Sequence, residues 1–344
     1  MDKNSSNVSS YDAGTLGILH LKRFWTMAMS AMQRNNAEKK SSAEGAIDQF
    51  VLDGLELDIC ETVSFLNEKK PTFPGFEEWI LAKHDGNIPS NIRKKINRAV
   101  TSYLKEEHKT YPLSPQIKDP VFTKEEMDFW EENGYIVLKN AIPLEDCKAA
   151  ENVIWDFLKM KPEEPNGWHK RSVPFWIRNY QHAIFLKNRK AARIHKAFAQ
   201  LWGTEELFQP INSLSFNPPI KDEHREYGPS YLHWDDSIAM PMRFDVIGML
   251  YLNDVDENQG AFQCVPGFHR IIESWLASLP EDADPREEIR GGFETVKVAG
   301  KAGDLIICRQ ELPHGSSLNK GDYPRFVQYI TMYPPDRRVN PVWK

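Results

Sequence analysis

The sequence predicts an α+β protein, with a helical N-terminal region followed by a β-rich core, a sandwich or jelly roll, that carries flanking helices. Two observations predict this class. Apolar residues from position 15 to about 110 recur near a 3.6-residue period, which is typical of helices that pack on one face. From about residue 211 the pattern changes to short apolar runs separated by Gly, Asn, Asp and Pro, which indicates strands joined by turns.

The composition is that of a globular protein with a mildly acidic surface. The chain has 344 residues, a net charge of −6 and 41% hydrophobic residues, a size that allows one large domain with an appendage or two domains. Phosphate binding needs a basic face, so nucleic acid is not expected as the main partner. The basic stretch at residues 92–98 predicts a solvated helix face, with a polyanion site as the alternative.

Membrane insertion and export are not expected. The chain contains no run of 18 or more apolar residues, and its first residues lack the apolar core of a signal peptide. A cytoplasmic location is therefore predicted, in which the four scattered cysteines are reduced thiols. Cys264 and Cys308 lie in apolar, strand-like runs and are expected in the core.

Three regions are predicted along the chain. Residues 1–14 are polar and are expected to form a disordered tail, residues 15–110 a helical region, and residues 120–340 the β-rich domain. A Pro-rich stretch from Tyr111 to Pro120 provides the linker. The helical region is interpreted as a brace for the core, a docking surface for a carrier protein or a dimer interface, so the choice between monomer and homodimer stays open.

The elements are predicted in chain order. The helical region has periodic stretches at residues 16–29, 46–67, 75–84 and 90–106. Thr123 and Glu126 form a capping box, which starts a helix that stops at Gly134. A strand at 135–138 and helices at 143–160 and about 190–202 come next. Strands are then expected at 211–216, 231–237, 246–254, 260–267, 295–299, 303–309 and 325–334.

A candidate metal site lies in the β-rich domain. His233 and Asp235 are two residues apart and would point to the same face of a strand. His314, after a later strand, would complete two histidines and one carboxylate, the ligand set of non-haem Fe(II) oxygenases. Arg325 in the last strand could bind a carboxylate with a bidentate fork, and Ser316 could add a hydroxyl donor. The alternative is that these are ordinary polar residues of a structural sandwich.

Several motifs between about residues 120 and 335 resemble those of the phytanoyl-CoA dioxygenase family of Fe(II)- and 2-oxoglutarate-dependent oxygenases. They are His233-Trp234-Asp235, Gly248–Asp254, Gly260–Arg270, His314-Gly315-Ser316 and Arg325. The resemblance implies a double-stranded β-helix, that is, a jelly-roll or cupin-like core. It implies that His233, Asp235 and His314 bind Fe(II), with no catalytic residue beyond the iron centre. It further implies that Arg325 and Ser316 bind the distal carboxylate of 2-oxoglutarate, with O2 as the other co-substrate.

The resemblance implies hydroxylation of an unactivated C–H bond of a small metabolite or natural-product intermediate, with release of succinate and CO2. Halogenating relatives replace the carboxylate ligand by a small residue, whereas Asp235 is present here. His269 is not expected to be a ligand, because the other three residues complete the set. The alternatives are desaturation or cyclisation by the same chemistry, or a non-catalytic cupin-like metal-binding protein.

Substrate residues are expected in segments 165–185 and 217–231, where aromatic, basic and amide groups are mixed. Trp168, Arg178 and Asn217 are the candidates for contacting an anionic or amphipathic small molecule, either free or linked to CoA or a carrier protein. The alternative is an aromatic core with solvated cations.

Overall fold

The computed structural model describes residues 8–34, 42–113, 117–169, 175–179, 181–220, 231–338, 340 and 342–343. The chain divides into two compact units. Unit 1 comprises Met1–Tyr111, Glu206–Ile211 and Tyr333–Trp343, and unit 2 comprises Pro112–Glu205 and Asn212–Met332. The helices in the described ranges lack the combination of length and apolar sequence that crossing a bilayer requires.

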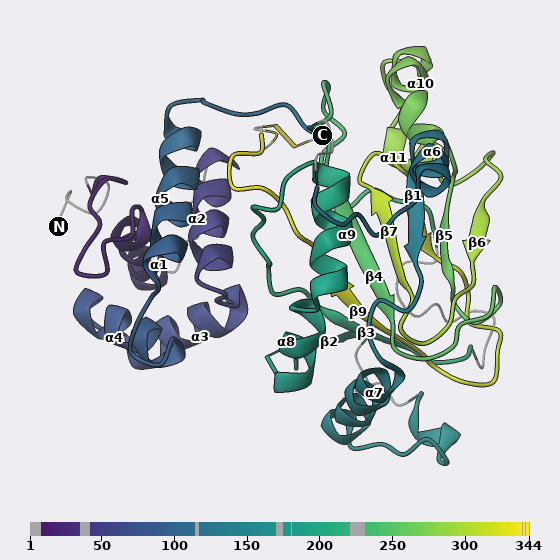
Figure 1. Cartoon of the computed structure of the whole chain (residues 1–344), viewed down its shortest axis with the longest axis horizontal. Helices are drawn as coiled ribbons and strands as arrows, with labels where there is room; N and C mark the ends of the chain where they lie inside the picture. Colours follow the sequence, from purple (N-terminus) through teal and green to yellow (C-terminus); the bar gives the residue numbers. More distant parts are fainter. Residues whose placement is uncertain are drawn as a thin grey trace. The chain divides into compact units, whose positions relative to one another are not determined.

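Unit 1 is helical, as predicted (Figure 1). Its helices are α1 (Leu21–Arg34), α2 (Ser42–Gly54), α3 (Ile59–Lys69), α4 (Phe73–Lys83) and α5 (Ser90–Leu104). The periodic stretch at 46–67 is two helices rather than one. The break has a local cause, because Asp58 caps α3 by accepting a 2.7 Å hydrogen bond from the Glu61 N–H, which starts a new helix there.

The N-terminal segment packs on these helices from the first described residue onward. Residues 1–7 of the predicted tail lie outside the described ranges, whereas the residues after them are hydrogen-bonded. The Ser10 hydroxyl lies 2.8 Å from Nδ1 of His20, and Nε2 of His20 lies 3.0 Å from Oδ1 of Asp48. Asp12 forms a 2.6 Å ion pair with Lys22. Helix α1 therefore begins at Leu21 rather than near residue 15, because the preceding turns are bonded elsewhere.

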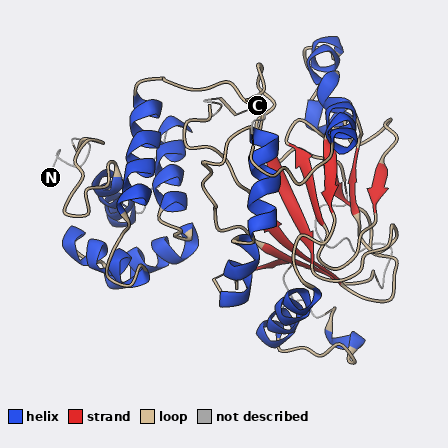
Figure 2. Cartoon of the chain, viewed as in Figure 1, coloured by secondary structure: helices blue, strands red, loops and turns tan. Residues whose placement is uncertain are grey.

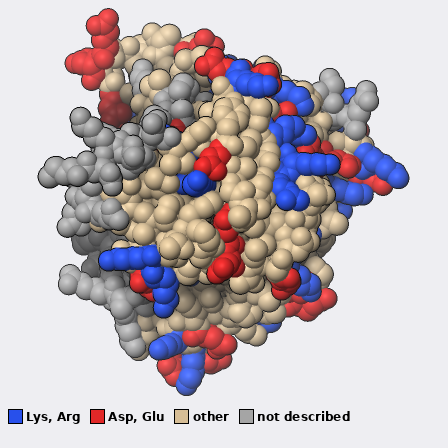
Figure 3. All heavy atoms as spheres, turned by 90° about the vertical axis from the view of Figure 1, so that its left-hand side faces the viewer, with Lys and Arg blue, Asp and Glu red and all other residues tan. Residues whose placement is uncertain are grey.

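The basic residues of α5 contact their own unit. Lys95 donates to the Leu207 carbonyl, and Arg98 forms a 2.6 Å ion pair with Glu206. The face of the molecule in Figure 3 carries acidic and basic side chains together. These contacts favour a structural role for the stretch at residues 92–98 over a polyanion site.

Two distant segments complete unit 1. The Phe208 N–H donates to the Tyr333 carbonyl at 2.8 Å, and the Tyr333 hydroxyl donates to the buried Asp53 carboxylate. The Phe50 ring packs on both aromatic rings, with centroid distances of 6.4 Å to Phe208 and 6.1 Å to Tyr333. The core of unit 1 thus depends on residues that lie far beyond its helices in the sequence.

Unit 2 contains two antiparallel sheets (Figure 2). The strands are β1 (Tyr135–Leu138), β2 (Trp176–Ile177), β3 (Leu214–Asn217), β4 (Val246–Tyr251), β5 (Phe262–Cys264), β6 (Val296–Val298), β7 (Leu305–Arg309), β8 (His314–Ser316) and β9 (Arg325–Ile330). The larger sheet has the order β1-β7-β4-β9-β3-β2 and the smaller β6-β5-β8. An α+β class with antiparallel sheets is therefore confirmed.

One apolar core joins the two sheets. Alternate residues of several strands enter it, as the two-residue period of strands requires. The larger sheet supplies Met249, Tyr251, Ile306, Cys308 and Val327, and the smaller sheet Phe262, Cys264 and Val298. The prediction that Cys264 and Cys308 are core residues is confirmed, and burial raises the pKa of the Cys264 thiol to about 12.

Helices cover the larger sheet on its other face. The helices and 3₁₀ turns of unit 2 are α6 (Lys124–Asn133), α7 (Leu144–Leu158), η1 (Pro165–Gly167), α8 (Ala183–Arg189), α9 (Ala192–Trp202), η2 (Phe268–Arg270), α10 (Ile272–Ser278) and α11 (Pro285–Glu288). Helix α9 runs alongside the sheet (Figure 1), and a Cβ at Gly248 of β4 would lie 3.1 Å from Phe198. Burial on both faces explains the unbroken apolar run of β7.

Most predicted elements are present, and two predictions need correction. The capping box of α6 is confirmed, with Gly134 at φ 78° after its end. The strand predicted at residues 231–237 is wrong, because this stretch, here named the Asp235 segment, makes a single bridge from His233 to His314. Residues 314–316, in contrast, form strand β8, which was not predicted. The Asp235 segment alternates apolar and polar residues as a strand does, but it forms only this one bridge to a strand.

Candidate functional site

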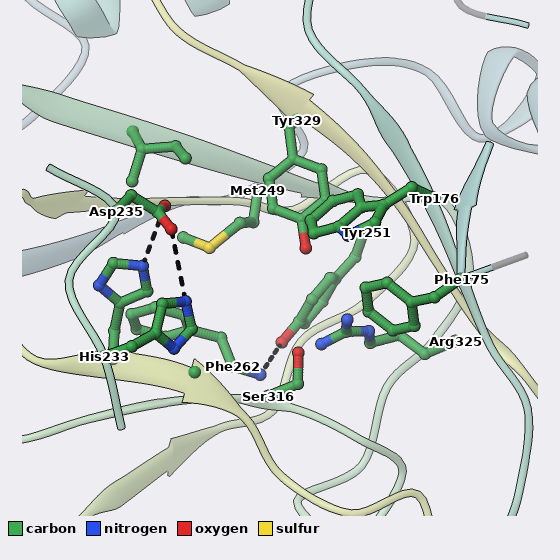
Figure 4. Close-up of a pocket in the computed structure, with 13 residues that line it drawn as sticks. Phe175, Trp176, His233, Asp235, Met249, Tyr251, Phe262, Ser316, Arg325 and Tyr329 are labelled. Atoms are coloured by element: carbon green, nitrogen blue, oxygen red, sulfur yellow. Dashed lines mark hydrogen bonds and ion pairs between the residues drawn. The ribbon is translucent and has the colours of Figure 1, made fainter. Parts of the chain in front are cut away.

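A pocket lies between the two sheets and encloses about 490 Å³ of space, part of it open to solvent. Residues of β4 and β9 enter it at strand spacing, and β2, β5, β8 and the Asp235 segment provide the remaining walls. The described lining residues are Phe175, Trp176, His233, Asp235, Ile247, Met249, Tyr251, Phe262, His314, Gly315, Ser316, Arg325 and Tyr329. Figure 4 shows that these side chains point toward one another.

The predicted ligand triad converges at one end of this pocket (Figure 4). Nε2 of His233 lies 3.4 Å from Oδ1 of Asp235, and Nε2 of His314 lies 3.3 Å from Oδ2 of the same carboxylate. All three ligand atoms fall within 4.8 Å of one another. Two imidazole nitrogens and one carboxylate oxygen at this spacing suit a divalent transition metal.

The other nitrogen of each ring fixes how the imidazoles are oriented. Nδ1 of His233 lies 3.1 Å from the Tyr231 carbonyl, and Nδ1 of His314 lies 3.0 Å from the Leu312 carbonyl. A carbonyl only accepts, so each Nδ1 carries the proton. In the neutral rings both Nε2 atoms then present lone pairs toward a carboxylate. Three acceptors that face one another are the arrangement that a bound cation satisfies.

The charges of the triad are coupled. Burial by itself raises the pKa of the Asp235 carboxyl, but the neighbouring imidazoles of His233 and His314 outweigh burial and hold that pKa well below its ordinary value. Burial lowers the pKa of His314, whereas the Asp235 carboxylate raises it to above the ordinary value overall. The carboxyl is therefore ionised at neutral pH, as a metal ligand must be.

Backbone pairing and one buried ring bring the ligands together. His233 and His314 exchange two hydrogen bonds, N–H to carbonyl, of 2.9 and 3.0 Å, which places their rings with centroids 5.0 Å apart. Between the two predicted ligands of the Asp235 segment, Trp234 turns into the core and donates from Nε1 to the Glu311 carbonyl at 3.0 Å. The Trp234 ring points into the apolar core, and the side chains of its neighbours His233 and Asp235 point into the pocket.

Arg325 and Ser316 lie at the other end of the pocket, on strands of different sheets (Figure 4). Arg325 is 2% exposed, and its Nη1 donates to the Gly260 carbonyl. Its Nε and Nη2 are buried without a hydrogen-bond partner in the described part of the chain. A buried guanidinium with free donors is costly unless an anion binds there, and a carboxylate matches its geometry.

Several lining residues were not anticipated from the sequence. Tyr251 is fully buried, accepts from the Phe262 N–H at 2.9 Å and donates to the Val298 carbonyl at 3.0 Å, so it links the sheets beside Arg325. Trp176 and Tyr329 pack with ring centroids 5.2 Å apart. Strand periodicity could have found Met249 and Tyr251, whereas β2 is too short to leave a pattern.

The three predicted substrate residues are not among the described lining residues. Trp168 packs on Trp155 with ring centroids 5.9 Å apart, and Arg178 is exposed. Asn217 pairs with Arg325 in the β3–β9 register. Its side chain packs closely on the backbone of Gly260, since a Cβ atom added to that glycine would lie 2.5 Å from Nδ2 of Asn217. Residues 170–174, 180 and 221–230 of the predicted substrate segments lie outside the described ranges.

His269 is remote from the triad. Its Nε2 lies 3.1 Å from the Glu131 carbonyl at the end of α6, and the metal-ligating group found among the described residues does not include it. The expectation that His269 is not a ligand agrees with this placement.

Comparisons with known proteins address the same region. The model of the phytanoyl-CoA dioxygenase family matches residues 130–327. A putative phytanoyl-CoA dioxygenase of Dictyostelium discoideum is 24% identical over 261 residues, which cover 60% of this chain and 74% of that protein. An ectoine dioxygenase of Bordetella bronchiseptica is 23% identical over 249 residues, which cover 63% of this chain and 79% of that protein.

A solved structure, EctD from S. alaskensis in its apoform, aligns with a TM-score of 0.49 at 17% identity, over 67% of this chain and 84% of that chain. The family match covers more than half of this sequence and starts beyond α1 to α5 of unit 1. The chain thus belongs to the phytanoyl-CoA dioxygenase family and is a dioxygenase of the Fe(II)- and 2-oxoglutarate-dependent class.

Proposed function

We propose that the protein hydroxylates an unactivated C–H bond of a small molecule while 2-oxoglutarate is converted to succinate and CO2. In this proposal His233, Asp235 and His314 bind Fe(II). The convergence of their three ligand atoms within 4.8 Å supports the assignment. Both Nδ1–H groups donate to backbone carbonyls, which leaves the Nε2 lone pairs for the metal.

Arg325 and Ser316 bind the distal carboxylate of 2-oxoglutarate in this proposal. The observation that carries it is the buried Arg325 guanidinium, whose Nε and Nη2 face the pocket of the triad without a partner among the described residues. A protein that only binds a metal has no need of this group. Ser316 is also buried, on β8, and its hydroxyl points toward Arg325 in Figure 4.

When bound, the iron supplies the oxidising chemistry, and the protein supplies orientation and a dry pocket. The side chains between the two ends of the pocket are mainly apolar, which excludes water from the reacting atoms. Asp235 occupies the position that halogenating relatives leave open for a halide, which favours hydroxylation over halogen transfer.

The substrate is proposed to enter past Trp176, whose ring lines the pocket and is 46% exposed. Phe175 packs on it edge to face with a centroid distance of 5.0 Å. Such a pair suits the apolar part of a small molecule. One relative acts on ectoine, as its name states, whereas the aromatic wall here is compatible with a less polar compound, free or linked to CoA or a carrier protein.

Succinate formation from 2-oxoglutarate with Fe(II), O2 and ascorbate tests the reaction, with candidate substrates added one by one. Substrate-dependent succinate, strongly reduced in Arg325→Ala at limiting 2-oxoglutarate, is the expected result. A product that gains one oxygen atom indicates hydroxylation, and one that loses two hydrogens indicates desaturation or cyclisation. Stoichiometric iron without 2-oxoglutarate turnover over a broad panel would contradict the proposal and favour a metal-binding protein.

Other expectations remain proposals. The two sheets of unit 2 are proposed to form a jelly roll. The division into domains at residues 15–110 and 120–340 is also a proposal, beside the two compact units. Roles for Trp168, Arg178 and Asn217 in substrate binding, and a cytoplasmic location, also stay predictions.

A further inference from the structure

The Asp235 segment carries a proposed iron ligand outside a regular strand. His233 is paired to β8 through its backbone, but the chain bends at Asp235 and Asp236 and leaves the sheet. Other contacts must therefore fix the carboxylate to within the small tolerance that a metal site allows.

Arg286 provides such a contact. Its Nη1 donates to the Trp234 carbonyl and its Nη2 to the Asp236 carbonyl, each at 2.8 Å. These are the carbonyls of the residues on either side of Asp235. One planar guanidinium thus ties down the backbone before and after the ligand, and its rigid fork fixes their relative orientation.

The segment that carries Arg286 is itself anchored. Asp284 caps α11 and accepts from the Arg286 N–H at 2.9 Å. Ile289, just after the helix, is fully buried in the core that joins the two sheets. The connection between β5 and β6 is therefore anchored at both Asp284 and Ile289, which holds the Arg286 guanidinium in place.

A second cation restrains the same segment from its side chain. Arg243 donates to the Asp236 carboxylate and also lies 3.5 Å from the Asp245 carboxylate. This contact fixes the residue after the ligand, whereas Arg286 binds the carbonyls of the residues before and after Asp235. Arg286 is therefore the contact whose loss is expected to free Asp235 most directly.

We propose that Arg286 is a positioning residue for the iron site, which sets the backbone of Asp235 and so the geometry of its carboxylate. The inference rests on the proposed iron ligands. Contacts that orient a metal ligand contribute strongly to metal affinity, and their loss typically weakens binding about 10- to 100-fold. The same substitution leaves the backbone pairing of His233 and His314 in place.

Metal titration of the full-length, metal-free protein tests this. Co(II) serves as the probe, because its visible absorption reports both affinity and ligand geometry, and 2-oxoglutarate is added in a second series. Arg286→Ala is expected to bind Co(II) about 10- to 100-fold more weakly, with an altered band shape. Arg286→Lys, which has a single ammonium group, is expected to lie between Arg286→Ala and the parent protein.

Arg193→Ala is the matched control, because this guanidinium also donates to a backbone carbonyl, that of Lys139, away from the pocket. It should bind Co(II) like the parent. Thermal unfolding of each metal-free variant separates weaker binding from lost folding, and if Arg286→Ala does not fold, Arg286→Lys decides. Parent-like affinity and band shape in the Arg286 variants would overturn the inference. Parent-like binding by His314→Ala would instead overturn the proposed iron site.

Discussion

Strand β8 and the Asp235 segment supply the proposed iron ligands by different means. His314 lies in a ladder, because β8 pairs with β5 from Cys264↔His314 to Phe262↔Ser316. Asp235 lies in a bend whose fixed points are side chains, the indole of Trp234 and the guanidinium of Arg286. One side of the site is built by the backbone and the other by particular residues.

The difference has consequences for substitution. A ladder tolerates changes of side chain, since its hydrogen bonds come from peptide groups. A bend that depends on side-chain donors is less well fixed when one donor is removed. The Asp235 side chain is 43% exposed and that of His314 only 6%. The carboxylate side of the site is therefore expected to be the more easily disturbed.

Removing the ligand of the bend is expected to have the largest effect. Asp235→Ala leaves two imidazoles and no negative charge, so iron binding and 2-oxoglutarate turnover should both fall to background. Metal content after gel filtration and succinate formation measure this. Asp254→Asn, which breaks an exposed ion pair with Lys301, is the control. Full iron occupancy in Asp235→Ala would show that the carboxylate is not a ligand.

Arg325 belongs to the strand-built part, so its loss should affect 2-oxoglutarate binding and leave the iron ligands in place. Arg325→Ala is expected to raise KM for 2-oxoglutarate about 10- to 100-fold, since hydrogen bonds to charged groups contribute about 1.5–3 kcal/mol. Fe(II) affinity measured without 2-oxoglutarate should not change. Arg325→Lys should recover part of the loss. A fall in Fe(II) affinity equal to that in 2-oxoglutarate affinity would contradict the separation of the two ends.

The pH dependence of stability tests His269, whose side chain contacts the Glu131 carbonyl at the end of α6. Burial, with Arg309 nearby, lowers its pKa from 6.5 to about 4. The unfolded chain therefore takes up this proton between pH 6.5 and 4 and the folded protein does not, so stability falls as pH falls through this window. From pH 7.5 to 5 the loss is about 1 kcal/mol, because solvent around the partly exposed ring screens the effect.

Urea unfolding at both pH values measures that loss. His269→Gln retains a donor toward the Glu131 carbonyl but has no group that titrates. Its stability should therefore depend less on pH, by about the same 1 kcal/mol. An unchanged pH dependence would show that another group is responsible.

The smallest effect is expected for Trp234→Phe, which keeps an aromatic ring in the core but removes the hydrogen bond to the Glu311 carbonyl. The free energy of unfolding should fall by about 1 kcal/mol. Trp275→Phe in the same aromatic cluster is the control. A larger loss of Co(II) affinity in Trp234→Phe than in Trp275→Phe would sharpen the comparison, and equal losses would weaken it.

The backbone-built features were the ones that sequence reasoning reached. Short apolar runs bounded by turn residues located β4, β7 and β9, and the capping box at Thr123 located α6, because these signals are local. His233, Asp235, His314, Ser316 and Arg325 were all selected from the sequence, and the structure places them around one pocket.

The remainder had no local signal. The Asp235 segment alternates like a strand, yet it forms only one backbone bridge, from His233 to His314, and side chains fix the rest. Arg286 lies about 50 residues after Asp235 in the sequence. Only the fold of the connection between β5 and β6 brings it to Trp234 and Asp236. The two-residue strand β2, which carries Trp176, is shorter than any period that a sequence can display.

The junction at Tyr333 has a consequence for synthesis. Strand β9 supplies Arg325 to unit 2, and a few residues later the same chain supplies Tyr333 to Phe50, Asp53 and Phe208 of unit 1. The ribosome releases the helices of unit 1 long before this tyrosine. The core of unit 1 is therefore completed only after the last strand of unit 2 has been synthesised, and a chain that stops before residue 333 lacks this part of that core.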